Sequence, residues 1–218
     1  KFPQHYIRAS YQHDTKIPGQ NLEFIQEDNV LLSFKRGENR SYLYNDIYKL
    51  EYKAEFQNNF SINAGLTKWK QNPAGVIRYQ IIPEIGDPTT IHQLNTTEAS
   101  IGFRWAPKEQ FYQGKLYRTP IYNKYPIFTF NYTAGIKGFL GGEYNYHNLT
   151  AGAFKRVYLS QFGYADVNLD GTYVLGDKIP YPLLTLHRAN QTYAYQLQSY
   201  NLMNFMEFIS DHHAALNV

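Results

Sequence analysis

The chain has 218 residues, with 21 tyrosines, 14 phenylalanines and no cysteine. The lack of cysteine excludes disulfides, thiolate chemistry and metal sites that need cysteine. The net charge of +3 is small and the basic residues are dispersed, so the chain lacks the basic patch typical of nucleic-acid binding. The aromatic load favours β-strands, and no run approaches the ~18 apolar residues of a transmembrane helix.

The first predicted elements are strands, because apolar and polar residues alternate along them. One strand is predicted from His5 to His13 and a second from Phe24 to Arg36, separated by a turn at Pro18-Gly19. The alternation is clearest at Val30 to Phe34 in the second of these segments.

The strongest pattern runs from Tyr44 to Trp69, and it predicts a long hairpin. Strict alternation over more than ten residues has the two-residue period of a strand, and it cannot give a helix one apolar face. One parity is apolar except for Asp46 and holds Tyr44, Tyr48, Leu50, Tyr52, Ala54 and Phe56, and after the turn Phe60, Ile62, Ala64 and Leu66. The other parity of the first strand holds Asn45, Lys49, Glu51, Lys53, Glu55 and Gln57.

The connection in this hairpin is predicted to be the loop of Gln57, Asn58 and Asn59. A loop of this length pairs Phe56 with Phe60 and keeps the apolar side chains on one face, whereas a turn of Asn58 and Asn59 alone would mix the faces. Such loops need a left-handed residue near their end, which asparagine tolerates.

Later segments repeat the alternation of apolar and polar residues. They are separated by long predicted connections at Lys70 to Asn95, at Ala106 to Tyr125 and around Pro180 to Tyr200. The further predicted strands are Thr97 to Trp105, Ile127 to Lys137, Glu143 to Leu159, Phe162 to Leu175, Leu202 to Ser210 and Ala214 to Val218. Roughly eight to eleven strands joined by alternating short turns and long loops are typical of a transmembrane barrel.

The fold class predicted is therefore all-β, an antiparallel transmembrane β-barrel formed by one domain over residues 1–218. Strands of ordinary globular proteins run about 5–6 residues, whereas outer-membrane strands need roughly 9–11. The residues predicted to face lipid are Tyr48, Leu50, Tyr52, Ala54, Phe56, Phe60, Ile62, Leu66, Ile101, Phe103, Phe128, Phe130 and Tyr132. Those predicted to face the lumen are Lys49, Glu51, Lys53, Glu55, Glu98 and Arg104.

One segment matches the spacing of a calcium-binding loop. Asp166, Asn168, Asp170 and Asp177 would supply oxygens around one ion. The same residues also fit a strand, in which the first three face a wet lumen, and the β-like flanks favour this second interpretation. We therefore expect no cofactor.

The histidines near the C-terminus carry no predicted site. His212 and His213 follow Asp211, but neighbouring residues of a strand point to opposite faces and cannot easily bind one metal ion. No catalytic motif is found, and we expect no enzymatic activity.

A resemblance to a known family is most specific in the segments Gly176 to Leu184, His187 to Gln191 and Tyr200 to Asp211, and it extends to the segments Gln4 to Arg8 and Phe103 to Glu109. In these segments the chain resembles a Bacteroidota-type outer-membrane family of unknown function, whose members carry a periplasmic carboxypeptidase-regulatory-like domain ahead of a barrel. That family is in turn distantly similar to the surface-antigen barrels of the BamA and TamA type. The Arg-Gly-Phe loop motif of those barrels is absent, and the stretch from Leu183 to Tyr200 stands in its place.

The resemblance implies a non-enzymatic protein of the outer membrane of a Gram-negative bacterium that takes part in envelope biogenesis. Its partners would be outer-membrane lipid and other outer-membrane or periplasmic proteins, and not nucleic acid. Two alternatives stay open: a passive porin-like or nutrient-uptake barrel, and a secreted β-rich protein that binds or hydrolyses glycans. We expect the chain to be part of a longer protein, truncated at both ends.

Overall fold

The computed structural model describes residues 3–18, 30–34, 36, 40–81, 87–114, 118–121, 123–176, 179–196 and 199–218. Its strands are β1 (His5–Lys16), β2 (Ser41–Glu55), β3 (Phe60–Gly75), β4 (Tyr79–Ile81), β5 (Thr89–Ile91), β6 (Leu94–Trp105), β7 (Phe111–Gln113), β8 (Arg118–Pro120), β9 (Ile127–Gly135), β10 (Tyr146–Tyr158), β11 (Tyr164–Gly176), β12 (Thr185–Leu186), β13 (Ile209–Ser210) and β14 (His212–Asn217). Three 3-10 helices are present among the described residues: η1 (Val30–Ser33), η2 (Ser160–Phe162) and η3 (Tyr181–Leu183).

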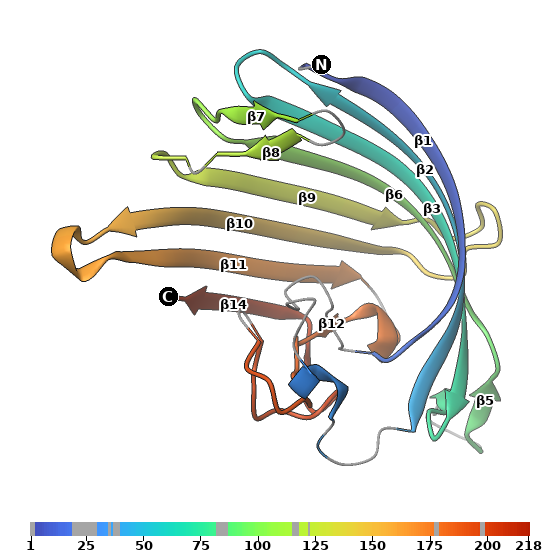
Figure 1. The fold of residues 1–218 in the computed structure, drawn as a ribbon. Helices are drawn as coiled ribbons and strands as arrows, with labels where there is room; N and C mark the ends of the chain where they lie inside the picture. Colours follow the sequence, from blue (N-terminus) through green and yellow to red (C-terminus); the bar gives the residue numbers. More distant parts are fainter. Residues whose placement is uncertain are drawn as a thin grey trace.

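Eight strands form one antiparallel sheet in the order β1-β2-β3-β6-β9-β10-β11-β14. Each strand pairs with the long strand that follows it in the sequence, and the pairs β4–β5, β7–β8 and β12–β13 form separate two-stranded sheets in the connections. Figure 1 shows the large sheet strongly curved, with a convex and a concave face. The prediction of an all-β fold with an antiparallel sheet is confirmed.

The sheet is open in the part of the chain that the structure describes. β1 and β14 are its two edges, and Figure 1 shows them on opposite sides of the hollow. The closed barrel expected from the sequence is therefore not observed in this chain. No helix in the described ranges is long and apolar enough to cross a membrane.

The connections differ at the two ends of the sheet. One end, which we call the short-turn end, holds the turns at 56–59 and 159–163 and the connection at 106–126 that carries β7 and β8. The other end, which we call the long-connection end, holds the connections at 17–40, 76–93, 136–145 and 177–211.

The β2–β3 hairpin has the predicted register. The amide N–H of Phe56 donates to the carbonyl oxygen of Phe60 at 2.9 Å, and Leu50 pairs with Leu66. Asn59 has φ 59°, which is the left-handed conformation that the turn requires. The predicted loop Gln57 to Asn59 is confirmed.

Two predicted strands are wrong in part. Within the predicted strand Phe24 to Arg36, η1 replaces the alternating stretch, while Phe24–Asn29 and Lys35 lie outside the described residues. β1 and β2 pair directly along their whole length, which leaves no sheet partner for a strand between them. Within Leu202 to Ser210 only β13 is a strand, because turns occupy the residues before it.

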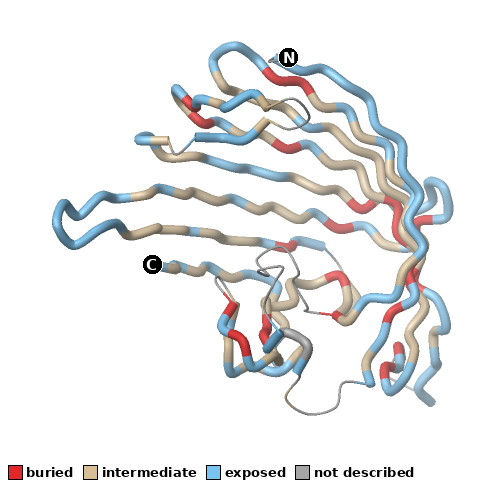
Figure 2. The backbone as a smooth tube through the Cα atoms, in the orientation of Figure 1, coloured by how far each residue is buried: buried red, intermediate tan, exposed pale blue. Residues whose placement is uncertain are grey.

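A small apolar core lies at the long-connection end. Leu43, Leu94 and Tyr146 of the large sheet pack with residues of the connections, namely Ile77, Tyr79 and Leu183. Figure 2 shows intermediate and exposed residues along the middle of most strands, so no second apolar layer covers the curved sheet among the residues that the structure describes. The core anchors the long connections against one end of the sheet.

Candidate functional site

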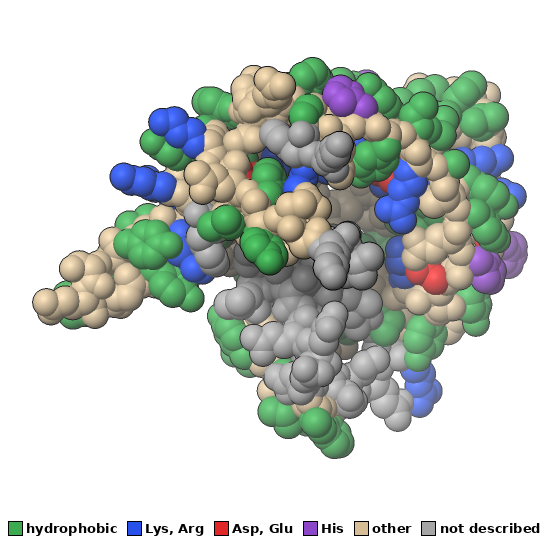
Figure 3. Space-filling model, turned by 45° about the horizontal axis from the view of Figure 1, so that its top comes forward, with side chains coloured by type: hydrophobic (Ala, Val, Ile, Leu, Met, Phe, Trp, Pro, Cys, Tyr) green, Lys and Arg blue, Asp and Glu red, His purple; other side chains and the backbone are tan. Residues whose placement is uncertain are grey.

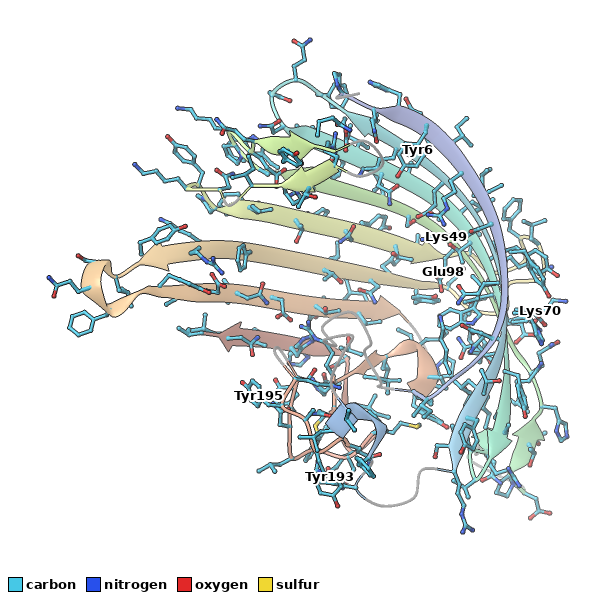
Figure 4. All side chains as sticks on the ribbon, in the orientation of Figure 1. Tyr6, Lys49, Lys70, Glu98, Tyr193 and Tyr195 are labelled. Carbon is cyan, nitrogen blue, oxygen red and sulfur yellow. The ribbon has the colours of Figure 1, made fainter. Side chains whose placement is uncertain are left out.

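The two faces of the sheet carry opposite chemistry. Along β2, Tyr48, Leu50 and Tyr52 lie on the convex face with 47%, 50% and 45% of their surface exposed. The alternating Lys49 and Glu51 lie on the concave face. Figure 4 shows Lys49, together with Glu98 from β6, on the hollow side of the sheet. The apolar side chains therefore point outward and the charged ones inward, which is the reverse of a sheet that packs on an apolar core.

The register places all the residues predicted to face lipid on the convex face. The more exposed of them are Tyr48, Leu50, Tyr52, Phe56, Ile101, Phe128 and Phe130, while Phe60, Ile62, Leu66, Phe103 and Tyr132 are half-buried. Ala54 is buried, and its partners in the register are His5 and Ile62.

Aromatic side chains form a continuous row on the convex face at the short-turn end. The rings of Phe60 and Phe103 stack with centroids 5.9 Å apart, and Phe103 stacks on Phe130 at 6.3 Å. Trp105 and Phe128 form a parallel stack at 6.1 Å. The register explains the row, because Phe103 lies directly opposite Phe130 and Trp105 directly opposite Phe128, while Phe60 reaches Phe103 diagonally across β3 and β6.

The residues predicted to face the lumen lie together on the concave face. Lys49 pairs with Glu51 at 2.6 Å, and Lys53 pairs with Glu55 at 3.3 Å. Both pairs run along β2 and do not cross to a neighbouring strand. Figure 3 shows acidic and basic side chains where the molecule is hollowed and many hydrophobic side chains over its outer rim.

The β7–β8 connection is held against the concave face by two bidentate ion pairs. Arg118 donates to both carboxylate oxygens of Glu55, at 2.8 and 3.0 Å. Arg104 donates to both oxygens of Glu109, at 2.6 and 2.7 Å. Both carboxylates are almost fully buried, so these contacts are ordered interior pairs rather than loose surface ones.

The β11–β14 connection lies over the other half of the concave face. Arg188 of this connection donates to Oδ2 of Asp170 on β11 at 3.0 Å, and His213 of β14 approaches the same oxygen at 3.4 Å. His187 packs against His213 with ring centroids 5.1 Å apart and contacts the hydroxyl of Ser210 at 3.0 Å. These contacts fix the connection to the polar face of the last two strands.

Asn190 organises the inside of this connection. It is 2% exposed, and its side-chain amide donates to the carbonyl oxygen of Ala194 and to Asn201, each at 2.7 Å. Its side-chain oxygen accepts hydrogen bonds from Thr192. Arg36, from the β1–β2 connection, donates to the carbonyl oxygens of Asn190 and Asn201 and so ties the two long connections together.

A cavity of about 530 Å³ remains between this connection and the sheet. Its polar walls include Thr150, Thr172, Asn168 and Arg188. Such a volume falls in the range of small-molecule sites. Nδ1 of His213 is buried there without a hydrogen-bond partner among the described residues.

The segment with calcium-loop spacing is a strand. Asp166, Asn168 and Asp170 lie on the concave side of β11, where alternate side chains are ~7 Å apart and cannot surround one ion. Asp166 pairs instead with Arg156 through two hydrogen bonds. Asp177 lies outside the described residues. In the described ranges no three histidine, aspartate or glutamate side chains gather as a metal site would require.

The comparisons with known proteins give a family and no activity. A family model described as the C-terminal domain of a family of unknown function (DUF5686) matches residues 21–213. The chain belongs to this family. No curated protein matches the chain, and no solved structure matches it. The matched residues include both connections that lie on the concave face.

Sequence analysis assigned no role to Arg188 or Asn190, and only the Arg-Ala-Asn segment of the family resemblance pointed to them. Arg188 acts through Asp170, 18 residues earlier in the sequence, whereas the side chain of Asn190 binds Thr192, Ala194 and Asn201 within the same connection. His187 lies in the same region, outside the strands. Burial lowers the pKa of its imidazole below the ordinary 6.5, and the neighbouring His213 lowers it further.

Proposed function

We propose that the chain forms the wall of a transmembrane β-barrel in the outer membrane of a Gram-negative bacterium and serves in envelope biogenesis without enzymatic activity. One observation carries the proposal: a curved sheet with an apolar convex face and a charged concave face. Water-soluble sheets bury their apolar face against another layer. Lipid is the solvent that suits an apolar outer surface and a polar interior.

The dimensions of the sheet fit this proposal. β2 and β3 have 15 and 16 residues, and a tilted strand needs roughly 9–11 to cross the hydrocarbon. The outward positions that form the middle of the sheet carry no Asp, Glu, Lys or Arg; they include Leu50, Tyr52, Ala64, Leu66, Ile101 and Tyr132.

Aromatic residues border this uncharged band at both ends, as interfacial girdles do. The Phe60–Phe103–Phe130 row lies at the short-turn end. The tilted ring pair Tyr11–Tyr48, with centroids 4.7 Å apart, lies toward the long-connection end. Two aromatic borders around an uncharged band favour a membrane-spanning sheet over a secreted glycan-binding protein, whose exposed aromatics would gather in one binding groove.

The occupied concave face favours a role in envelope biogenesis over the passive porin alternative. A diffusion pore needs an open aqueous lumen, whereas here the Glu55–Arg118 and Asp170–Arg188 pairs hold two connections across the hollow. Ordered polypeptide inside a barrel suits a component of an assembly or export complex, whose conformation changes when partners bind.

Membrane placement is tested by extraction and gel migration. We expect the protein to require detergent for extraction and to migrate faster on gels when unheated than when boiled. A protein that is soluble without detergent and whose migration is independent of heating would contradict the membrane proposal and favour the secreted alternative.

The role itself is tested by depletion in cells. We expect depletion to lower the levels of other outer-membrane proteins, measured by quantitative proteomics of membrane fractions. Planar-bilayer recordings test the porin alternative, since a passive pore would show a fixed single-channel conductance. Unchanged outer-membrane protein levels together with steady conductance would favour the porin alternative.

A further inference from the structure

On the four middle strands β2, β3, β6 and β9, outward charge is confined to one end of the convex face, which the proposed barrel does not by itself require. Along β2, β3, β6 and β9, the outward Asp, Glu, Lys and Arg residues are Asp46, Lys68 and Lys70, and all three lie toward the long-connection end. Figure 4 shows Lys70 on the side of the sheet away from Lys49 and Glu98. The outward charges therefore form one local cluster just beyond the apolar band.

The two lysines of this cluster differ in their neighbours, because Asp46 lies opposite Lys70 in the register and Lys68 has no acidic partner. The Asp46 carboxylate is divided among several groups, since His13 approaches its Oδ1 at 2.7 Å and the Tyr11 hydroxyl donates to the same oxygen at 3.0 Å. In the register Lys68 lies between Tyr48 and Thr97, and neither of those side chains is acidic. Alternate residues of a strand lie on the same face ~7 Å apart, so Lys68 and Lys70 can bracket one phosphate group.

The connection from β9 to β10 adds an apolar tip beside these lysines. Its base is tied to β6, where the Ile136 amide donates to the Thr97 carbonyl at 2.8 Å and the Glu143 amide donates to the Asn95 carbonyl at 3.1 Å. Asn95 and Thr97 are the residues of β6 that lie opposite Lys70 and Lys68. Figure 1 shows this connection, between β9 and β10, extending beyond the convex side of the sheet.

The tip presents two apolar side chains to solvent. Phe139 and Leu140 are 47% and 50% exposed. Leu140 has φ 46°, a left-handed conformation that is unfavourable for leucine, and a hydrogen bond from the Gly138 amide to the Gly142 carbonyl at 2.8 Å closes the turn around it. Lys137 is exposed at the start of the tip, and the Glu143 carboxylate at its end accepts a hydrogen bond from Asn95 at 2.9 Å.

We propose that this part of the convex face binds the phosphate of an anionic phospholipid headgroup. Lys68 and Lys70 contact the phosphate, Lys137 adds positive charge, and Phe139 and Leu140 enter the boundary of the acyl chains. The inference rests on the proposed membrane placement, because the cluster then lies at the level of the headgroups. Basic side chains at a membrane surface attract anionic lipid, and apolar side chains beside them insert below the headgroups.

The test is retention of phosphatidylglycerol against phosphatidylcholine by the full-length protein in detergent, measured by native mass spectrometry. We expect the wild type to retain phosphatidylglycerol preferentially. Because one lysine near a membrane surface contributes about fivefold in affinity, Lys68→Gln combined with Lys70→Gln should reduce that retention about 25-fold. Lys155→Gln is the matched control, since Lys155 lies on the convex face at the other end of β10.

The outcomes separate this inference from the proposed function. Equal phosphatidylglycerol retention by the wild type and the double variant, with both proteins heat-modifiable, would overturn the headgroup site and leave the barrel standing. An equal loss in Lys155→Gln would also overturn it, because any outward lysine would then suffice. A wild-type protein that stays in water and takes up no lipid would overturn both.

Discussion

The convex and concave faces are built from the same strands, yet different interactions order their side chains: apolar contacts on the convex face and ion pairs on the concave face. On the convex face aromatic and aliphatic side chains stack along the register with no described layer over them. On the concave face buried ion pairs hold two connections in place. The comparison teaches that an alternating strand gives two chemically distinct surfaces, and that the solvent on each side decides which surface is stable.

The largest effect is expected from a charge placed on the convex face. Leu50→Lys should destabilise the folded protein by ~2–4 kcal/mol if Leu50 lies near the membrane midplane. Glu51→Lys, the neighbouring residue on the concave face, loses one half-exposed pair with Lys49 and should cost about 1 kcal/mol or less. Urea unfolding in lipid vesicles measures both variants. Equal tolerance at the two positions would contradict the lipid-facing assignment.

The next effect concerns the ion pair that fixes the β11–β14 connection. Arg188→Gln leaves the partly buried Asp170 carboxylate without its guanidinium, which should cost ~1.5–3 kcal/mol locally. Limited proteolysis should then cut within residues 184–208 faster than in the wild type, while Arg188→Lys should restore part of the protection. Unchanged cleavage would mean that the other contacts of the connection, such as the Arg36 hydrogen bonds, hold it without the Asp170–Arg188 pair.

A smaller effect is expected from pH through His187. The folded protein binds the proton of His187 less readily than the unfolded chain, since burial and His213 lower the pKa of its imidazole. The stabilising contribution is therefore present above the ordinary pKa of 6.5 and is lost as the pH falls below it. Hydrogen exchange in residues 184–196 should speed up at pH 5 relative to pH 7.5, after correction for intrinsic rates. His187→Gln should reduce this pH response, and an unchanged response would assign it to another group.

The smallest effect is expected at the turn that sets the register of β2 and β3. Asn59→Ala places alanine at φ 59° and removes the hydrogen bond to the Glu109 carbonyl, which should cost about 1–2 kcal/mol. Asn59→Gly keeps the backbone conformation at no steric cost and should lose less. The difference between the urea midpoints of the two variants measures the cost of placing a Cβ atom in the left-handed conformation, because both variants lose the hydrogen bond to Glu109. Identical midpoints would mean that the turn conformation contributes nothing.

The β2–β3 hairpin was predictable to the residue because its signal is local. The period-two pattern specifies the faces, and the parity of Phe56 and Phe60 leaves a loop of only one length between them. The family match over residues 21–213 agrees with the resemblance in the sequence, although it gives no activity.

The β11–β14 connection was not predictable by the same means. Arg188 binds Asp170 on another strand, and Arg36 donates to the carbonyl oxygen of Asn190 from 154 residues earlier in the sequence, so both contacts arise only in the folded chain. The alternation at Val30 to Phe34 was likewise misleading, because a local pattern does not show whether a neighbouring strand is free to pair with the segment. For the same reason the pattern could not show that β1 and β14 do not pair with each other.

The central claim is that lipid covers the convex face and water the concave face. The chain has no cysteine, so single cysteines at positions 47–54 of β2 can carry a nitroxide label in reconstituted membranes. The measurement is the accessibility of each label to apolar oxygen and to a water-soluble nickel complex. We expect oxygen accessibility to peak at 48, 50 and 52 and nickel accessibility at 49, 51 and 53. Equal accessibility on both parities, or nickel accessibility highest at 50, would contradict the membrane placement.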